Sequence, residues 1–499
     1  MKKQVILVVD YGTSNVRVNA IDTEDGAILC SASRKYLILS KEPGYAEISA
    51  DELWTFSEAC MINVMDQIRK YRQDTGEEIV PRAVAFSFFG DNLIPVDKNG
   101  NALNDCILCT DARGEDEVAK IYRGISEKDQ IEIIGDSYTL YKFGTKVLWI
   151  KKHMPEIAEK TAYYDSQQQF IFRKLGIPAV NDYTMAARKQ MCALSPQKWS
   201  KRFLDVLGVT EESLGKEIIG TGEIVGYISS YGKAAFDTRL PVIAGGHDCD
   251  VAMIGMGVID EKEALIGDIT GTFDHVGFLA ASIVNLRKEH PEFPMCSYNG
   301  PLKDTSICLG AFPTAGATLE WFMRDIHGGT SKEDYSTYWN SVKFDGKGGV
   351  MVIPTLDNAR GVIEGVGVNT KKTDIFKAVI EALTFENRRL VDNCKAVKSS
   401  GVERVRIGGG AANSDEWMQL RADITGVKVE RMKNIQISSV GSAVLAAVAT
   451  GIYSDLESAV NKMVKVEDVF VPNPEVQRKY EIKYQKYIKR QIGSFGKEI

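Results

Sequence analysis

The sequence lacks several features that would assign it to a specialised class. Its apolar runs fall short of the roughly 18 residues of a membrane span, and the run after Lys3 is too short for a signal peptide. Its charge is not strongly of one sign, since a net charge of −6 over 499 residues gives no electrostatic reason to expect nucleic acid or an anionic membrane as partner. We therefore expect a cytoplasmic protein that binds neither.

Cysteine is also sparse. The nine cysteines are an odd number scattered along the chain, which is typical of reduced thiols. Cys106 and Cys109 form a single CxxC pair without a second pair, so we do not expect a redox or zinc site there. With 44% hydrophobic and 26% charged residues the composition is that of an ordinary globular protein, and the length predicts two domains.

Two short segments, one opening each half, share a pattern. Apolar residues 5–9 lead to Asp10 and then to Gly12-Thr13-Ser14, and apolar residues 264–266 lead to Thr270-Gly271-Thr272. Each predicts a strand that turns tightly into a second strand, with backbone N–H groups and hydroxyls able to bind phosphate oxygens. The pair suggests a duplicated architecture that closes on a nucleotide from both sides.

Hydrophobic periodicity and turn residues predict the surrounding elements. The expected helices are 51–69, 371–397, 417–424, 441–450 and a charged terminal helix, and the expected strands include 28–33, 36–39, 84–88, 241–244 and 405–407.

Two carboxylates are candidates for chemistry. Asp10 ends the first strand and could hold Mg²⁺ beside phosphates, although it could also be an ordinary turn residue. Asp248 follows two glycines at the seam between the halves, where phosphoryl transfer to a hydroxyl needs a carboxylate to accept the proton. Asp250 is the other candidate for this base, and Asp248 could instead be the N-cap of a helix. His247 is expected to be structural.

Further polar groups indicate binding surfaces. The glycine triplet 408–410 lies between a strand and a helix, where it could approach a nucleotide or simply form a tight turn. Asp91, Asn92 and Asp111 could satisfy adjacent hydroxyls of a polyhydroxy ligand. Arg113 could join them or could form a structural ion pair with Asp111.

The ordered motifs resemble the FGGY family of carbohydrate kinases over nearly the whole chain. They are Asp10–Ser14, Gly245–Asp248 with Gly255, Thr270–Thr272, and Gly408–Ala411 followed by Trp417, joined by Pro43–Glu47, Thr110–Arg113, Lys146–Trp149 and Gly316–Trp321.

The resemblance implies an α/β fold of two actin-like (ribonuclease H-like, ASKHA) domains, residues 1–244 and 245–499, each a mixed sheet flanked by helices around a central ATP cleft. The terminal helix could pack back on the first domain. Family members are often homodimers or homotetramers.

By the same resemblance Asp248 is the base of an ATP-dependent carbohydrate kinase, with Asp10 serving Mg²⁺. The implied ATP-binding residues are Gly12, Thr13, Ser14, Arg17, Thr270, Gly271, Thr272, Gly316, Glu320, Gly409, Gly410, Asn413 and Ser414, with the choice between Asn413 and Ser414 open. The substrate side comprises Asp91, Asn92, Asp111, Arg113, Asp248 and Cys249.

The chain departs from the family on the acceptor side. Gly90-Asp91 stands where xylulokinase-like members carry Met-His, and Cys249 stands where Gln or Asn is usual. These differences argue against glycerol and xylulose as substrates. They do not affect the motifs implied to bind the nucleotide. The alternatives are a kinase of a non-sugar hydroxylated signal such as an autoinducer, and a non-catalytic actin-like ATP-binding sensor.

Overall fold

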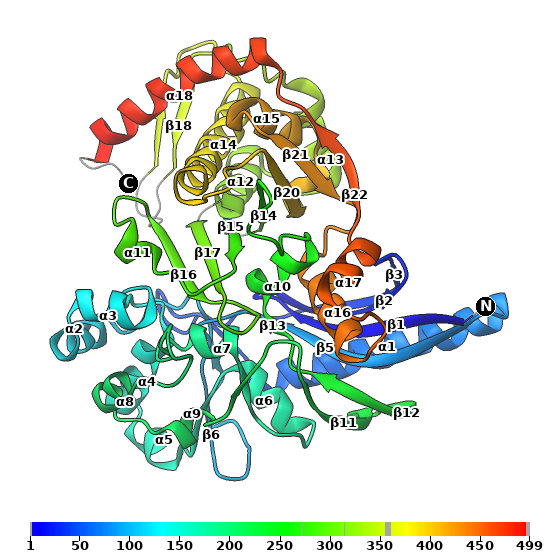
Figure 1. Cartoon of the computed structure of the whole chain (residues 1–499). Coiled ribbons are helices and arrows are strands. Elements are labelled where there is room, and N and C mark those ends of the chain that lie inside the picture. The colour runs from blue at the N-terminus through cyan, green and yellow to red at the C-terminus, as the bar shows by residue number, and fades with distance from the viewer. Residues whose placement is uncertain (1, 272, 314, 355–360, 496–499) are drawn as a thin grey trace.

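Two seven-stranded sheets, one from each half of the chain, form the framework of the computed structural model, which describes residues 2–271, 273–313, 315–354 and 361–495 (Figure 1). The first sheet has the order β11 (Ile224–Tyr231), β12 (Ala234–Ile243), β5 (Glu78–Phe88), β1 (Lys2–Tyr11), β2 (Asn15–Asp22) and β3 (Ile28–Lys35), with β13 (Gly246–His247) also on β5. The second has the order β16 (Met295–Asn299), β17 (Ser306–Phe312), β15 (Asp274–Ala280), β14 (Leu265–Thr270), β20 (Arg404–Gly409), β21 (Lys428–Met432) and β22 (Val466–Phe470).

The two sheets repeat one pattern of strand directions. In the first, β1, β2 and β3 are antiparallel neighbours, and β5 lies parallel to β1 on its other side. In the second, β14, β15 and β17 are antiparallel neighbours, and β20 lies parallel to β14. A helix of 26 residues precedes the parallel strand in each half, α1 (Ala50–Thr75) before β5 and α14 (Lys372–Val397) before β20. The fold is therefore the duplicated α/β architecture that the paired turns predict.

The first strand is apolar on both faces because it is covered on both faces. Val5, Leu7 and Val9 belong to the core shared with α1, whereas Ile6 and Val8 join the core of the second half. Successive side chains of a strand point to opposite faces, so an uninterrupted apolar run fits a central strand with helices on each side.

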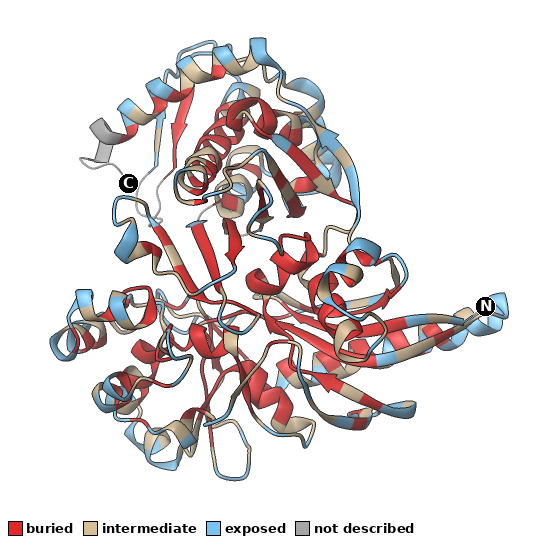
Figure 2. Ribbon diagram, in the orientation of Figure 1, coloured by how far each residue is buried: buried red, intermediate tan, exposed pale blue. Residues whose placement is uncertain are grey.

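Helices α10 (Asp248–Gly255) and α16 (Ile437–Ala449) lie between the sheets and are almost wholly buried (Figure 2). They cross at two glycines with no room for a side chain. A Cβ on Gly441 would lie 1.8 Å from the Val251 carbonyl oxygen, and one on Gly255 would lie 1.9 Å from the Ile437 carbonyl oxygen. From this crossing, the Ser442 hydroxyl of α16 donates to the Phe86 carbonyl of β5 at 2.7 Å.

A helical region begins after β7 (Cys106–Ile107) in the first half. It comprises α2 (Glu115–Gly124), α3 (Glu127–Ile134), α4 (Phe143–His153), α5 (Pro155–Lys160), α6 (Gln167–Lys174), α7 (Tyr183–Arg188), α8 (Lys201–Leu207) and α9 (Glu211–Leu214). Short strands β4 (Glu47–Ile48), β6 (Ile94–Val96), β7 (Cys106–Ile107), β8 (Tyr163–Asp165), β9 (Asn181–Asp182) and β10 (Ile218–Ile219) connect these parts.

The second half adds its own helices around the second sheet. They are α11 (Leu286–Glu289), α12 (Ala315–Trp321), the π-helix Phe322–His327, α13 (Lys332–Ser341), the 3₁₀ turn Gly410–Asn413, α15 (Asp415–Thr425), α17 (Leu456–Met463) and α18 (Pro474–Phe495), with the hairpin β18 (Met351–Ile353) and β19 (Val362–Glu364). Within the described ranges, helices long and apolar enough to cross a bilayer are absent.

Two expectations about elements are corrected. Residues 36–39 do not extend the large sheet, because Leu39 pairs instead with Glu47 in an isolated bridge. The terminal helix α18 packs on α14 of the second half rather than on the first half. Buried acids on α14 hold it there: Tyr480 donates to Glu381 at 2.8 Å, and Gln491 donates to Glu386 at 2.8 Å.

Candidate active site

Strand register brings the first-half and second-half motifs together. Asp10 of β1 lies opposite Ser87 of β5, and Ser87 lies opposite Gly246 of β13 on its other side. Asp248 follows two residues after Gly246 and begins α10. The three strand ends therefore place Asp10 and Asp248 at one edge of the first sheet, where ligands collect in open α/β sheets.

The glycines before Asp248 are required by this path. Gly245 has φ +67°, and a Cβ there would lie 2.0 Å from the Phe86 carbonyl oxygen. On Gly246 a Cβ would lie 2.8 Å from the Thr221 side chain. Only glycine lets the chain pass so close to β5 and still deliver Asp248 at the end of the turn.

Asp248 and Asp10 form an acidic pair in different surroundings. The side chain of Asp248 is 31% exposed, whereas Asp10 is buried and accepts a hydrogen bond from Ser439 at 3.1 Å. Burial raises the pKa of Asp10, and the charge of Asp248 raises it further against the opposing effect of Arg17, 3.8 Å away. Asp248 is thus the carboxylate open to a ligand, and Asp10 lies behind it.

The donors suit Mg²⁺ at Asp10 better than at the cluster beside Asp248. Mg²⁺ favours carboxylates and phosphate oxygens, and two close carboxylates with like charge gain from a cation between or beside them. Ligand atoms of His247, Asp248 and Cys249 lie within 4.8 Å of one another, but a thiol ligand suits softer metals. The carboxylate of Asp10 therefore fits Mg²⁺ by its chemistry.

A cavity of about 910 Å³ opens beside the second sheet. Six residues predicted for the nucleotide line it, namely Gly271, Gly316, Glu320, Gly410, Asn413 and Ser414. Aromatic side chains also line it: Tyr335, Trp339 and Trp417. Flat apolar surfaces with glycine backbone and a few polar groups suit a heteroaromatic ring such as a nucleobase.

Thr270 and Gly409 fix the position of the glycine loop that lines this cavity. The Thr270 hydroxyl donates to the Gly408 carbonyl at 3.0 Å and accepts from the Ala411 N–H at 3.2 Å. Gly409 has φ +101°, and a Cβ there would lie 1.9 Å from the Thr270 carbonyl oxygen. The glycine triplet is therefore fixed against β14. Thr272 lies outside the described residues.

The first-half turn forms the predicted hairpin. The Gly12 N–H donates to the Asn15 carbonyl at 2.9 Å, closing the turn between β1 and β2. Ser14 at its tip is exposed, and Thr13 is half-buried. Arg17, two residues into β2, lies next to Asp10.

Strand β15 connects the cavity to Asp248. Asp274 lines the cavity, and the next residue, His275, places its Nδ1 3.7 Å from Cys249 Sγ. Burial lowers the pKa of His275 to about 4 despite the nearby charge of Asp248. Asp274 and His275 are consecutive residues of β15, so one strand connects the cavity lining to the surroundings of Asp248, which does not itself line the cavity.

The predicted acceptor residues divide into two groups. Asp91 is half-buried with φ +54°, and its Oδ1 has no hydrogen-bond partner among the described residues. Asn92 is fully buried, donating to the Phe89 carbonyl at 2.6 Å and accepting from the Gln167 N–H at 2.7 Å. Of these two, only Asp91 has a side-chain oxygen without a partner among the described residues, and that oxygen is itself buried.

Arg113 forms the ion pair with Asp111 that the sequence left as one of two alternatives. Two nitrogens of Arg113 donate to Asp111 at 2.7 Å, and the guanidinium also lies 2.9 Å from Glu47. Its plane lies over the rings of Tyr45 and Trp149. Asp111 and Arg113 therefore form a buried ion-pair network, in which their polar groups bind one another and Glu47.

Lys146 holds the backbone beneath Asp91. Its buried ammonium donates to the Asp91 carbonyl at 2.8 Å and to the Tyr141 carbonyl. Burial lowers the pKa of Lys146 to about 8, although the Asp91 charge opposes the shift.

This lowered pKa predicts how stability depends on pH. An unfolded lysine keeps its proton up to about pH 10, whereas folded Lys146 loses it near 8. Between these values the unfolded state binds more protons, so the contribution of Lys146 to stability rises with pH. We expect the free energy of unfolding of the native chain, minus that of Lys146→Met, to increase from about pH 7 to about pH 10 in urea titrations. A difference that stays flat or falls would contradict this.

Sequence reasoning missed the groups that surround Asp248. Arg188 of α7 lies 3.2 Å from Asp250, and His247 contacts both Asp248 and Asp250. The i,i+3 spacing of His247 and Asp250 at a helix start could have indicated their contact. Nothing in the sequence indicates Arg188, because its partner is 62 residues away.

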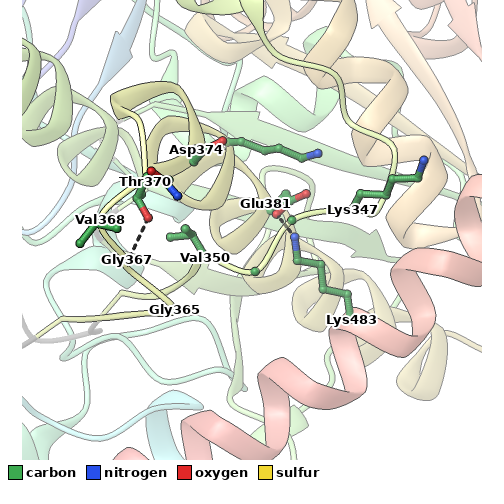
Figure 3. Close-up of a pocket in the computed structure, with 13 residues that line it drawn as sticks. Lys347, Val350, Gly365, Gly367, Val368, Thr370, Asp374, Glu381 and Lys483 are labelled. Atoms are coloured by element: carbon green, nitrogen blue, oxygen red, sulfur yellow. Dashed lines mark hydrogen bonds and ion pairs between the residues drawn. The ribbon is translucent and has the colours of Figure 1, made fainter.

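A second cavity of about 470 Å³ lies between α14 and α18 (Figure 3). None of the predicted site residues lines it. Its Lys483 points toward Glu381 in an ion pair, and Lys377 lies 2.8 Å from Asp345. Because these cations are already paired with acids of the chain, we assign the cavity no ligand.

The CxxC pair lies in surroundings that favour protonated thiols. Cys106 and Cys109 are both free, and burial raises the pKa of the Cys109 thiol to about 12. A thiol held in its protonated form is a weak nucleophile and a poor metal ligand.

Comparison with known proteins agrees with this geometry. The N-terminal domain of the FGGY family of carbohydrate kinases matches residues 5–255, and its C-terminal domain matches residues 310–450. A xylulose kinase of Staphylococcus epidermidis is 28% identical, covering 98% of this chain and 96% of its own. A glycerol kinase of Lactobacillus acidophilus is 27% identical, covering 92% of each.

Solved structures share the fold at lower identity. Xylulose kinase from Lactobacillus acidophilus with bound ligand has a TM-score of 0.84 at 20% identity, covering 99% of both chains. Gluconate kinase from the same organism has 0.83 at 20%, covering 98% of both. Plasmodium falciparum glycerol kinase with ADP has 0.82 at 21%, covering 98% of this chain and 99% of its own. With two actin-like domains and both family domains matched in order, the chain belongs to the FGGY family of carbohydrate kinases and is a phosphotransferase.

Proposed function

We propose that the protein transfers the γ-phosphoryl group of ATP to a hydroxyl of a small sugar, ketose or polyol. ATP occupies the cavity of the second half, and the acceptor lies beside Asp91 and Asp248. The observation that carries the proposal is the shared position on β15, where Asp274 lines the cavity and His275 reaches the residue after Asp248. This strand supports a donor site and an acceptor site joined through β15.

Asp248 acts as the general base. As the acceptor oxygen bonds to the γ-phosphorus and the bond to the leaving ADP oxygen breaks, the hydroxyl proton passes to the Asp248 carboxylate. Asp10 would hold Mg²⁺, which neutralises charge developing on the phosphates when bound. Phosphate contacts come from two segments. One comprises Gly12, Thr13, Ser14 and Arg17 of the first half. The other comprises Thr270, Gly271 and Thr272, of which Thr270 contributes by holding the glycine loop and Thr272 lies outside the described residues.

We place the boundary between a sugar-binding first domain and an ATP-binding second domain between residues 244 and 245. The first domain ends with β12, and the second begins with the turn that delivers Asp248. Asp248 then lies just after this boundary, on a segment that still pairs with β5 of the first sheet and falls within the match to the N-terminal family domain. Asp91 lies on the first domain, and closure of the domains would exclude water from the reacting groups.

The acceptor is polyhydroxylated. The relatives named above are kinases of xylulose, glycerol and gluconate, all rich in hydroxyls. Asp91 offers an unpartnered carboxylate oxygen that two adjacent hydroxyls could share. Cys249 cannot match the hydrogen bonds of an amide, so the acceptor differs from that of family members with Gln or Asn there.

A screen of ADP release tests the proposed function. Purified protein with ATP and Mg²⁺ is assayed alone and with pentuloses, hexuloses, polyols, sugar acids and an autoinducer-type diol. We expect ADP release to depend on one class of polyhydroxy acceptor. Slow hydrolysis that ignores every acceptor would indicate an ATP-binding sensor, and activity with the signal molecule alone would indicate the other alternative.

A larger side chain at Gly410 should weaken ATP binding. Gly410 lines the cavity, and a Cβ there meets no atom within 4 Å, so the side chain of Gly410→Leu would enter open space that the nucleotide needs. We expect the Kd for ATP to rise at least about tenfold, or about 1.4 kcal/mol, with the melting temperature unchanged. Gly367→Leu is the control, since its Cβ is also free but lies outside this cavity. If Gly410→Leu and Gly367→Leu bound ATP with equal affinity, ATP would have to bind outside this cavity.

A further inference from the structure

His247 lies between two carboxylates. Its Nδ1 is 2.5 Å from Asp250 Oδ2, and its Nε2 is 3.3 Å from Asp248 Oδ1. A carboxylate oxygen is a hydrogen-bond acceptor, and an imidazole nitrogen that carries a proton can donate to it. The ring therefore connects the proposed base to a buried acid.

The ring of His247 is fixed by its surroundings. Its backbone N–H donates to the Thr184 hydroxyl at 2.8 Å, and that hydroxyl donates to Asp182 at 2.6 Å. Its ring packs against the backbone of Gly90, where a Cβ would lie 2.7 Å from the imidazole Cδ2. Only glycine at position 90 leaves the space that this histidine ring fills.

Asp250 is anchored from the other side. Arg188 donates to the same Oδ2 at 3.2 Å, and its guanidinium lies 4.1 Å from the centre of the Tyr298 ring. Burial opposes ionisation of Asp250, but Arg188 and His247 together lower its pKa. The acid therefore stays charged and gives His247 a fixed partner.

We propose that His247 is a positioning residue that orients the Asp248 carboxylate for proton transfer; this rests on the proposed function. Both contacts fall on one oxygen, since Asp248 Oδ1 accepts from the Cys249 N–H at 2.7 Å and lies 3.3 Å from His247 Nε2. Oδ2 is then the oxygen directed at the acceptor hydroxyl. It takes the proton as the acceptor oxygen bonds to phosphorus and the ADP oxygen leaves.

Two amide variants of His247 test the role. The amide nitrogen of His247→Gln can take the place of Nε2 and still donate to Asp248, whereas that of His247→Asn reaches only the place of Nδ1. We expect His247→Asn to lower kcat about 10- to 100-fold with the KM for ATP unchanged, and His247→Gln to retain most of the kcat. Thermal unfolding of both variants checks that they are equally folded.

Coupling to Asp250 provides the second readout. Asp250→Asn removes the charge that fixes the ring, so it should lower kcat, and the double variant with His247→Asn should lose no more than the more impaired single variant. Residues that act through one another show such non-additive losses.

Three results decide between the possibilities. Equal kcat in the two His247 variants, or additive losses in the double variant, would overturn the positioning role. If Asp248→Asn is inactive while His247→Asn is fully active, the inference alone fails. If Asp248→Asn keeps its activity, the proposed function fails, and the inference fails with it.

Discussion

Asp248→Asn should lose phosphorylation about 10²- to 10⁴-fold in kcat while binding ATP with unchanged affinity. The amide has the size of the carboxylate but cannot accept the hydroxyl proton. The residues that line the nucleotide cavity come from other elements, so the affinity for ATP should persist. ADP release with the acceptor found by the screen measures the first quantity, and calorimetric titration with ATP measures the second.

The control for this variant is Asp205→Asn. Asp205 is an exposed carboxylate of α8 whose partner is Lys201, and its loss should leave kcat unchanged. Turnover of Asp248→Asn at the level of the control would show that another group accepts the proton. A large loss of ATP affinity would show that Asp248 serves the nucleotide instead.

Gly441→Ala should destabilise the whole chain by more than about 3 kcal/mol. The new methyl would lie 1.8 Å from the Val251 carbonyl oxygen and 2.9 Å from the Gly255 nitrogen, both backbone atoms that cannot rotate away. Helices α10 and α16 would have to separate, which opens the core between the two sheets. Urea unfolding followed by circular dichroism gives the loss, and failure to obtain soluble protein is its extreme form.

Gly349→Ala is the matched control for this prediction. Its Cβ would meet no atom within 4 Å, and its backbone lies outside the left-handed region. The control should therefore change stability by no more than about 0.5 kcal/mol. A Gly441→Ala protein as stable as this control would show that the helices cross at a larger distance.

Local sequence signals predicted the elements that carry the site. The helix expected over 371–397 is α14 (Lys372–Val397), because a long amphipathic period with flanking turn residues is a local property. The hairpins at Gly12 and after Thr270 followed from apolar runs that end in Gly-Thr turns. Asp248 could be singled out because two adjacent glycines at a strand end already indicate a tight backbone path.

Contacts between distant segments could not be predicted in this way. Arg113 is engaged by Glu47 as well as by Asp111, and Asn92 is tied to the backbone at Gln167, 75 residues away. The hydrogen-bonding groups of such polar residues are already occupied by partners distant in the sequence, so they cannot bind a ligand. For the same reason His247 appeared structural, since the part played by Asp250 and Arg188 depends on the packing of α7 against α10.

The crossing of α16 over the first sheet also means that the two domains cannot be separated at their sequence boundary. A fragment ending at residue 244 would leave Ile6, Val8 and Ala85 without the cover that residues 437–449 provide. Such a fragment would expose an apolar strand surface to water and aggregate, unless the complementary fragment were co-expressed to cover it.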